Sequence, residues 1–168
     1  MLQRAYDLIC FDVDGTLVRH PTGKVIWEVL NERFMGDHTI NIERHRWYNE
    51  GRISYEQWVE LDVQGWITAG ATRGDIVEAV REFEHFDGAH DTLWELKRRG
   101  ARLAIISGTL DIVIDTLFPE HPFDDVYSNR LIFGPSITEI PVAQVYRAAH
   151  ELIAISRTDS LFRAEKYL

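Results

Sequence analysis

The sequence predicts an α/β fold in which a parallel sheet is flanked by helices and a helical segment follows the first strand. Residues 8–11 form a short apolar run, typical of a strand buried on both faces of a parallel sheet, and residues 101–106 are predicted to form a second core strand. Each run ends in small polar residues, and residues 18–86 between them show helical spacing without a comparable strand signal. We therefore expect a sheet that is interrupted by a helical insert.

The first predicted strand leads directly into the sequence Asp12-Val13-Asp14-Gly15-Thr16. In an open α/β sheet, ligands bind at the carboxyl ends of the strands, and buried aspartates are costly unless they are paired or bound to a metal. Asp12 and Asp14 therefore indicate a Mg²⁺ site with oxygen ligands, and a plain Asp-Gly turn is the alternative. An EF-hand loop is excluded, because Gly15 comes too soon after Asp12 and the spaced oxygen ligands of such a loop, which end in a Glu, are missing.

The insert, residues 18–86, carries recognisable helix starts and stops. Apolar residues between 25 and 34 recur at helical spacing, and Gly36 follows as a stop. Residues 54–57 form a capping box, and residues 72–75 offer another helix start. Several helices are therefore predicted in this segment.

Four of the five tryptophans lie within this insert. Our preferred interpretation is that they form the insert's own core. The alternative is that one or two of them line a pocket facing Asp12. The four residues are Trp27, Trp47, Trp58 and Trp66.

Helices and strands alternate again after residue 86. A helix is predicted from Gly88, with Gly100 as its stop, and the strand over 101–106 then ends in Ser107-Gly108-Thr109. Residues 110–118 have helical periodicity. A strand, a short Ser-Gly turn and a helix N-terminus together form an anion site, because free N–H groups point outward. Ser and Thr are also ordinary helix N-caps, which is the alternative explanation.

The remaining chain contains weaker signals. Residues 124–129 are predicted to form a third strand, and residues 130–133 and 137–140 a hairpin. Pro141 fits the first turn of a helix. Residues 152–155 are a fourth strand candidate, followed by a charged tail.

Composition narrows the classes of function. The 168 residues suffice for a core with a small insert, and the net charge of −9 argues against a nucleic-acid partner. No stretch approaches the ~18 apolar residues of a membrane span, and the N-terminus does not resemble a signal peptide, so a cytoplasmic protein without a membrane partner is expected. Cys10 cannot form an internal disulfide, and we expect it to be a small buried residue.

The string of an apolar strand followed by DxDGT resembles the first motif of the haloacid dehalogenase-like (HAD) phosphohydrolases. The resemblance implies that Asp12 is a nucleophile that forms an aspartyl-phosphate and that Asp14 is a general acid/base. Ser107 then matches the residue that binds the phosphoryl group, with Gly108 and Thr109 donating their N–H groups. The implied fold is a Rossmann-like parallel sheet.

The layout is similar to the phosphoserine phosphatase branch, in which a helical cap is inserted into the core. On that pattern the core domain comprises residues 1–17 and 87–168, and the cap comprises residues 18–86. In that branch, a Glu and an Arg bind the amino and carboxylate groups of serine. On our placement, Pro21 and Asp62 stand at these two positions. Because an acid in place of an arginine would repel a substrate carboxylate, phosphoserine is not expected to be the substrate.

The resemblance weakens towards the C-terminus. Arg147 is the best counterpart of the family's phosphate-binding lysine, and Asp159 is the nearest acid that could serve as a third metal ligand beside Asp12 and Asp14. Ser156-Arg157 stands where the family has Gly-Asp. Either the chain is a minimal member that uses Asp159, or its last part has diverged and lost some of the site.

The resemblance therefore implies a Mg²⁺-dependent phosphomonoester hydrolase acting on a small phosphorylated metabolite. The alternative is a catalytically impaired protein of the same fold, with an incomplete metal site, that acts in binding or interaction. A monomer or homodimer is expected in either case.

Overall fold

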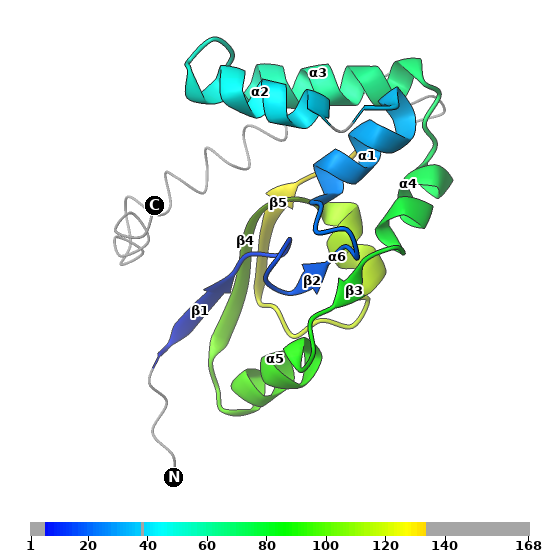
Figure 1. Ribbon diagram of the computed structural model, residues 1–168. Helices are drawn as coiled ribbons and strands as arrows, with labels where there is room; N and C mark the ends of the chain where they lie inside the picture. The colour runs from blue at the N-terminus through cyan, green and yellow to red at the C-terminus, as the bar shows by residue number, and fades with distance from the viewer. Residues whose placement is uncertain (1–5, 38, 134–168) are drawn as a thin grey trace.

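The computed structural model describes residues 6–37 and 39–133, and its centre is a three-stranded parallel sheet in the order β1-β4-β5 (Figure 1). Helices α5 and α6 pack against the central strand β4. The predicted α/β fold with a parallel sheet flanked by helices is confirmed. These elements are β1 (Leu8–Phe11), β4 (Arg102–Leu110), β5 (Asp125–Asn129), α5 (Ala89–Arg98) and α6 (Asp111–Leu117).

A short two-stranded ladder, which we call the neck, joins the two ends of the helical insert. Strand β2 (Val18–Arg19) pairs antiparallel with β3 (Glu84–His85). Beside the ladder, the Phe86 N–H donates a 3.0 Å hydrogen bond to the Leu17 carbonyl oxygen. These strands were not predicted, because two residues are too few to show a period.

Four helices lie between the two strands of the neck. The predicted start at Ser54 is confirmed: the Gln57 N–H donates to Ser54 Oγ at 3.2 Å, and the Ser54 N–H donates to Gln57 Oε1 at 2.8 Å. Thr72 caps the next helix in the same way. The four helices are α1 (Ile26–Met35), α2 (Thr39–Asn49), α3 (Tyr55–Thr68) and α4 (Arg73–Val80).

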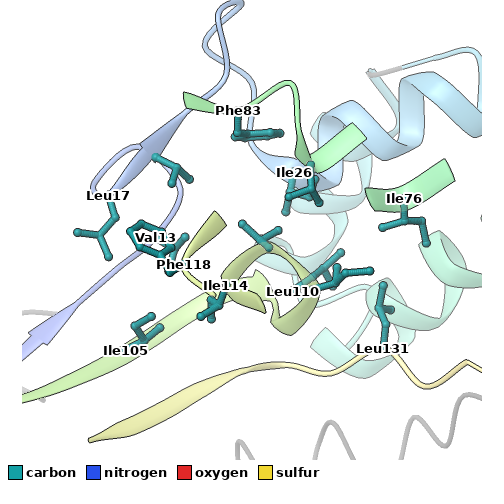
Figure 2. Packing of buried hydrophobic residues seen from close by; sticks show 14 of the residues in the cluster. Val13, Leu17, Ile26, Ile76, Phe83, Ile105, Leu110, Ile114, Phe118 and Leu131 are labelled. Carbon is teal, nitrogen blue, oxygen red and sulfur yellow. The ribbon is translucent and has the colours of Figure 1, made fainter. Parts of the chain in front are cut away.

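One continuous apolar core joins the insert to the sheet (Figure 2). Ile105 of β4 and Ile114 of α6 lie in the same cluster as Ile26 of α1 and Ile76 of α4, and each is at least 98% buried. Val13, directly after β1, is fully buried in this cluster. The core therefore holds the loop that carries Asp12 against both parts of the protein.

Two predictions for segments near the aspartates differ from the structure. Residues 107–109 are not a turn, because β4 continues through them to Leu110, with an irregularity in its pairing to β5 after Ile106. The predicted hairpin strand over 130–133 is not formed within the described residues, and its partner over 137–140 lies outside them, as do the helix from Pro141 and the strand over 152–155.

The prediction that residues 8–11 are buried on both faces is also wrong, and Cys10 is exposed. In the described part of the chain β1 is an edge strand, and the core contacts the face of β4 that carries Leu103 and Ile105. Cys10 is paired in register with Ala104, on the opposite face. Among residues 6–37 and 39–133, no helix combines the length and apolar character needed to cross a bilayer.

Candidate active site

A tight loop after β1 positions the two aspartates. The carbonyl oxygen of Val13 accepts hydrogen bonds from the N–H groups of Thr16, Leu17 and Val18 at 2.9–3.1 Å. Gly15 has a φ of 78°, which favours glycine. Because the Val13 side chain is fully buried, the loop is anchored between Asp12 and Asp14.

Asp12 lies opposite Ser107. The Ser107 hydroxyl donates a 2.8 Å hydrogen bond to Asp12 Oδ1, and Ser107 Oγ in turn accepts from the Thr109 N–H at 3.1 Å. Asp12 is exposed to the cavity rather than buried, so its carboxylate is open to a ligand. Parallel pairing of β1 with β4 brings these residues together from distant parts of the sequence.

Asp14 is less exposed than Asp12 and has a different electrostatic environment. Its Oδ1 atom accepts a 3.2 Å hydrogen bond from the Ile26 N–H in the first turn of α1. Burial raises the pKa of Asp14 above its usual value, and the negative charges of Asp12 and Glu28 raise it further. The nearby Thr109 hydroxyl and the hydrogen bond from the Ile26 N–H lower this pKa, but by less than burial raises it. A raised pKa suits a carboxylic acid that must donate a proton.

A cavity of about 270 Å³ lies between the aspartate loop and the insert. The described residues that line it include no Lys or Arg. Trp27 and Trp58 line this cavity. The interpretation that all four tryptophans of the insert form the core of the insert is therefore wrong. Trp66, which is 2% exposed, does lie in the core. The lining consists of Asp12, Asp14, Val25, Trp27, Tyr55, Trp58, Val59, Asp62, Ser107, Gly108 and Thr109.

Hydrogen bonds join the insert to the end of β4 at this cavity. The Trp27 indole N–H donates to the Gly108 carbonyl oxygen at 2.9 Å. The Asn129 side-chain amide donates to the same oxygen and to the Tyr55 hydroxyl, each at 2.7 Å. Two helices of the insert, α1 and α3, are thus held against the strand that carries Ser107.

Asp62, on α3, lies in the cavity wall and belongs to a buried polar network. Its Oδ1 atom accepts a 3.1 Å hydrogen bond from Asn31 Nδ2 and also pairs with the Arg44 guanidinium. Asn31 Oδ1 accepts from the Trp66 indole N–H at 2.7 Å. Burial raises the pKa of Asp62, while Arg44, Asn31 and Trp58 lower it by a smaller amount. The network therefore ties together α1, α2 and α3.

The other predicted site residues, Arg147 and Asp159, lie outside the described residues. Within residues 6–37 and 39–133, no group of three or more His, Cys, Asp or Glu side chains could hold a metal ion. Asp12 and Asp14 supply carboxylate oxygens, the donors that Mg²⁺ prefers. The described residues therefore fit two ligands of a Mg²⁺ site, and a third acid would have to come from elsewhere in the chain.

The family comparison agrees with this geometry. The family model for haloacid dehalogenase-like hydrolases matches residues 9–160, which include both aspartates and Ser107. The chain belongs to this family.

Two curated haloacid dehalogenase-like relatives are similar to the chain. A phosphoserine phosphatase of Methanocaldococcus jannaschii is 28% identical over 131 residues, which cover 78% of this chain and 59% of the relative. The (S)-2-haloacid dehalogenase of Pseudomonas sp. strain YL is 31% identical over 91 residues, which cover 54% of this chain and 39% of the relative. The chain thus spans about three-fifths of the length of the first relative and less of the second.

A solved structure supports the same placement. The phospho-aspartyl intermediate analogue of a phosphoserine phosphatase is 26% identical, with a TM-score of 0.57, over 77% of this chain and 59% of that chain. The likeness to a haloacid dehalogenase-like phosphatase therefore extends from sequence to fold.

Several residues of this haloacid dehalogenase-like site were missed from sequence. Asn129 ends β5 at the same sheet edge as Asp12, and the rule that ligand sites form at the carboxyl ends of strands could have identified it. Tyr55 follows a recognised helix cap, but its contact with Asn129 is long-range and left no local pattern. Arg44 gave no signal, because its partner Asp62 is on another helix.

Proposed function

We propose that this protein is a Mg²⁺-dependent phosphomonoester hydrolase that works through an aspartyl-phosphate on Asp12. The observation that carries the proposal is the 2.8 Å hydrogen bond from Ser107 to Asp12, with Asp14 on the same loop at the cavity. The membership of the family and the similarity to phosphoserine phosphatases support it.

In this mechanism an Asp12 carboxylate oxygen attacks the phosphorus of the substrate, and the bond from phosphorus to the alcohol oxygen breaks. Asp14 donates a proton to the departing alcohol, which its raised pKa favours. The carboxylate of Asp14 then takes a proton from water, which attacks the phosphorus and releases Asp12 and inorganic phosphate. Ser107 and the backbone of Gly108 and Thr109 hold the phosphoryl oxygens, with Arg147 proposed as their cation.

Mg²⁺ would be held by the Asp12 side chain, by the Asp14 backbone carbonyl and by Asp159. When bound, Mg²⁺ supplies positive charge that offsets the negative charges of the phosphoryl group and the nucleophile. The helical insert acts as a cap, because Trp27, Tyr55 and Trp58 of its helices line the cavity that holds Asp12. Such a cover excludes water from the reacting groups.

The test is the Asp12→Asn variant, assayed with p-nitrophenyl phosphate in the presence of Mg²⁺ or of a chelator. The amide keeps the shape of the side chain but cannot form the acyl phosphate, so we expect no Mg²⁺-dependent hydrolysis and an unchanged circular dichroism spectrum. Asp91→Asn, which alters an exposed carboxylate on α5, is the matched control. Activity of the Asp12 variant near that of the control would overturn the proposal.

The second candidate is a protein of the same fold that binds but does not catalyse. It is favoured by the lack of a third acid near Asp12 and Asp14 among the described residues. Isothermal titration of Mg²⁺ into the wild type and Asp159→Ala separates the two. A functional site predicts at least about tenfold weaker binding in the variant, because the ion loses a charged ligand, whereas equally feeble binding by both proteins favours the second candidate.

A further inference from the structure

The side of the cavity formed by the insert combines aromatic rings with one buried carboxylate. Trp27 of α1 and Tyr55 and Trp58 of α3 line it together with Asp62. The hydrogen bonds of Trp27 to Gly108 and of Tyr55 to Asn129 fix two of these rings at 2.9 and 2.7 Å. The aromatic wall is therefore organised before any ligand enters, which lowers the entropic cost of binding.

Asp62 has one carboxylate oxygen that its neighbours do not use. The residue is fully buried, and its Oδ1 atom binds both Asn31 and Arg44. In the described part of the chain, its Oδ2 atom accepts no hydrogen bond. The Trp58 indole N–H faces Asp62 closely enough to lower its pKa as a hydrogen-bond donor does, but it is buried and forms no hydrogen bond of normal geometry. An unsatisfied buried carboxylate oxygen is costly and favours a ligand that supplies a donor.

The charges around the cavity select the type of donor. Asp12, Asp14 and Asp62 are the charged residues among those that line it, and all three are acidic; Arg44, which pairs with Asp62, does not line the cavity. An ammonium group satisfies both features of the wall, since it donates N–H groups to a carboxylate and is attracted by the faces of aromatic rings. A substrate carboxylate would meet negative charge, and an apolar group would leave Asp62 Oδ2 unsatisfied.

We propose that the cavity selects phosphomonoesters of small amino alcohols that lack a carboxylate, with the ammonium group between Trp27, Tyr55 and Trp58 and donating to Asp62 Oδ2. This inference rests on the proposed function, because the phosphate must lie at Asp12 for the alcohol to reach Asp62. The overall reaction takes up one water and releases the amino alcohol and inorganic phosphate.

Three substrates that differ by one group at a time test the inference: ethyl phosphate, 2-aminoethyl phosphate and O-phosphoserine. We expect kcat/KM for 2-aminoethyl phosphate to exceed that for ethyl phosphate by about tenfold, the scale of a desolvated cation–π contact. O-phosphoserine, which adds a carboxylate, should fall below 2-aminoethyl phosphate. Equal values for ethyl and 2-aminoethyl phosphate, or a preference for O-phosphoserine, would overturn the inference.

Substitutions of Asp62 and Trp58 test whether these cavity-lining residues cause the preference for 2-aminoethyl phosphate. In Asp62→Asn, the ratio of kcat/KM for 2-aminoethyl phosphate over ethyl phosphate should fall towards one. Because that change also leaves Arg44 without its carboxylate, Trp58→Leu provides a second variant that keeps the ion pair and should lower the same ratio. Trp47→Leu is the matched control, since Trp47 of α2 packs under the Arg52 guanidinium and does not line the cavity. An unchanged ratio in both wall variants would contradict the assignment.

Binding separates this inference from the proposed function. Calorimetric titration of the three phosphates into Asp12→Asn should give the same order of affinity without turnover. Tighter binding of 2-aminoethyl phosphate by Asp12→Asn, together with no hydrolysis of any of the three by the wild type, would overturn the proposed function and support the inference. Equal affinities for ethyl and 2-aminoethyl phosphate, with hydrolysis of both, would overturn the inference alone.

Discussion

The Trp27 indole N–H donates a 2.9 Å hydrogen bond to the carbonyl oxygen of Gly108, the residue after Ser107. This bond joins α1 of the insert to β4, the strand that carries Ser107. Asn129 donates to the same carbonyl oxygen and to Tyr55 of α3. The position of the insert and the geometry of β4 are therefore coupled at one backbone group.

Removing the Trp27 donor should weaken substrate binding. Trp27→Phe keeps an aromatic ring but loses a hydrogen bond, which is typically worth about 1 kcal/mol, so we expect KM to rise about fivefold with a smaller change in kcat. Steady-state kinetics with p-nitrophenyl phosphate measures both constants. Trp94→Phe on α5, which loses an exposed contact with His90, is the control, and a KM equal to that of the control would argue against the coupling.

The Ser107 hydroxyl should contribute directly to catalysis. Hydrogen bonds to charged groups contribute about 1.5–3 kcal/mol, so Ser107→Ala should lower kcat/KM by about 10- to 100-fold. Ser107→Thr keeps the hydroxyl and should retain most of the activity. If Ser107→Ala kept the kcat/KM of the wild type, Ser107 would have no role in holding the phosphoryl group.

The network around Asn31 should stabilise the insert. Asn31 is fully buried and satisfies both Asp62 and the Trp66 indole. Asn31→Ala leaves these two groups without that partner, so we expect the free energy of unfolding to fall by about 2–4 kcal/mol. Urea denaturation measures the change, with Asn49→Ala on the exposed surface of α2 as the control. A loss no larger than that of the control would show that the network is not stabilising.

Asp124 should make stability depend on pH. Its hydrogen bonds from Lys97 and from the Leu103 N–H hold its pKa below the usual value of 3.8. A carboxyl whose pKa is depressed by folding stabilises the protein above its unfolded pKa, and that stability is lost as the pH falls through the folded pKa.

We therefore expect Asp124→Asn to lower Tm at pH 7 and to match the wild type more closely near pH 3. Thermal melts across this range test the expectation, with Asp91→Asn on α5 as the control for loss of an exposed carboxylate. A constant difference in Tm between Asp124→Asn and the wild type at every pH would contradict it.

Elements with their own local signal could be predicted from the sequence. The apolar runs that form β1 and the start of β4, and the cap at Ser54, each follow from neighbouring residues. The meeting of Asp12 and Ser107 at one sheet edge also follows, because parallel strands bring their carboxyl ends together.

Features that depend on contacts between distant segments could not be predicted. The exposure of Cys10 is set by which face of β1 the core covers, and an apolar run does not specify that face. The extended conformation of Gly108 depends on pairing of the neighbouring strands and on its contacts with Trp27 and Asn129, whereas its local sequence resembles a turn.

The ladder between β2 and β3 has a consequence for how the chain reaches its native state. Without it, β1 can meet β4 only by closing a loop that contains the whole insert, and the entropic cost of a loop rises with the logarithm of its length. Once Val18 pairs with His85, the effective loop is shortened about fourfold, which lowers that cost by about 1 kcal/mol. A neck that closes early would therefore speed the search by which β1 finds its partner strand.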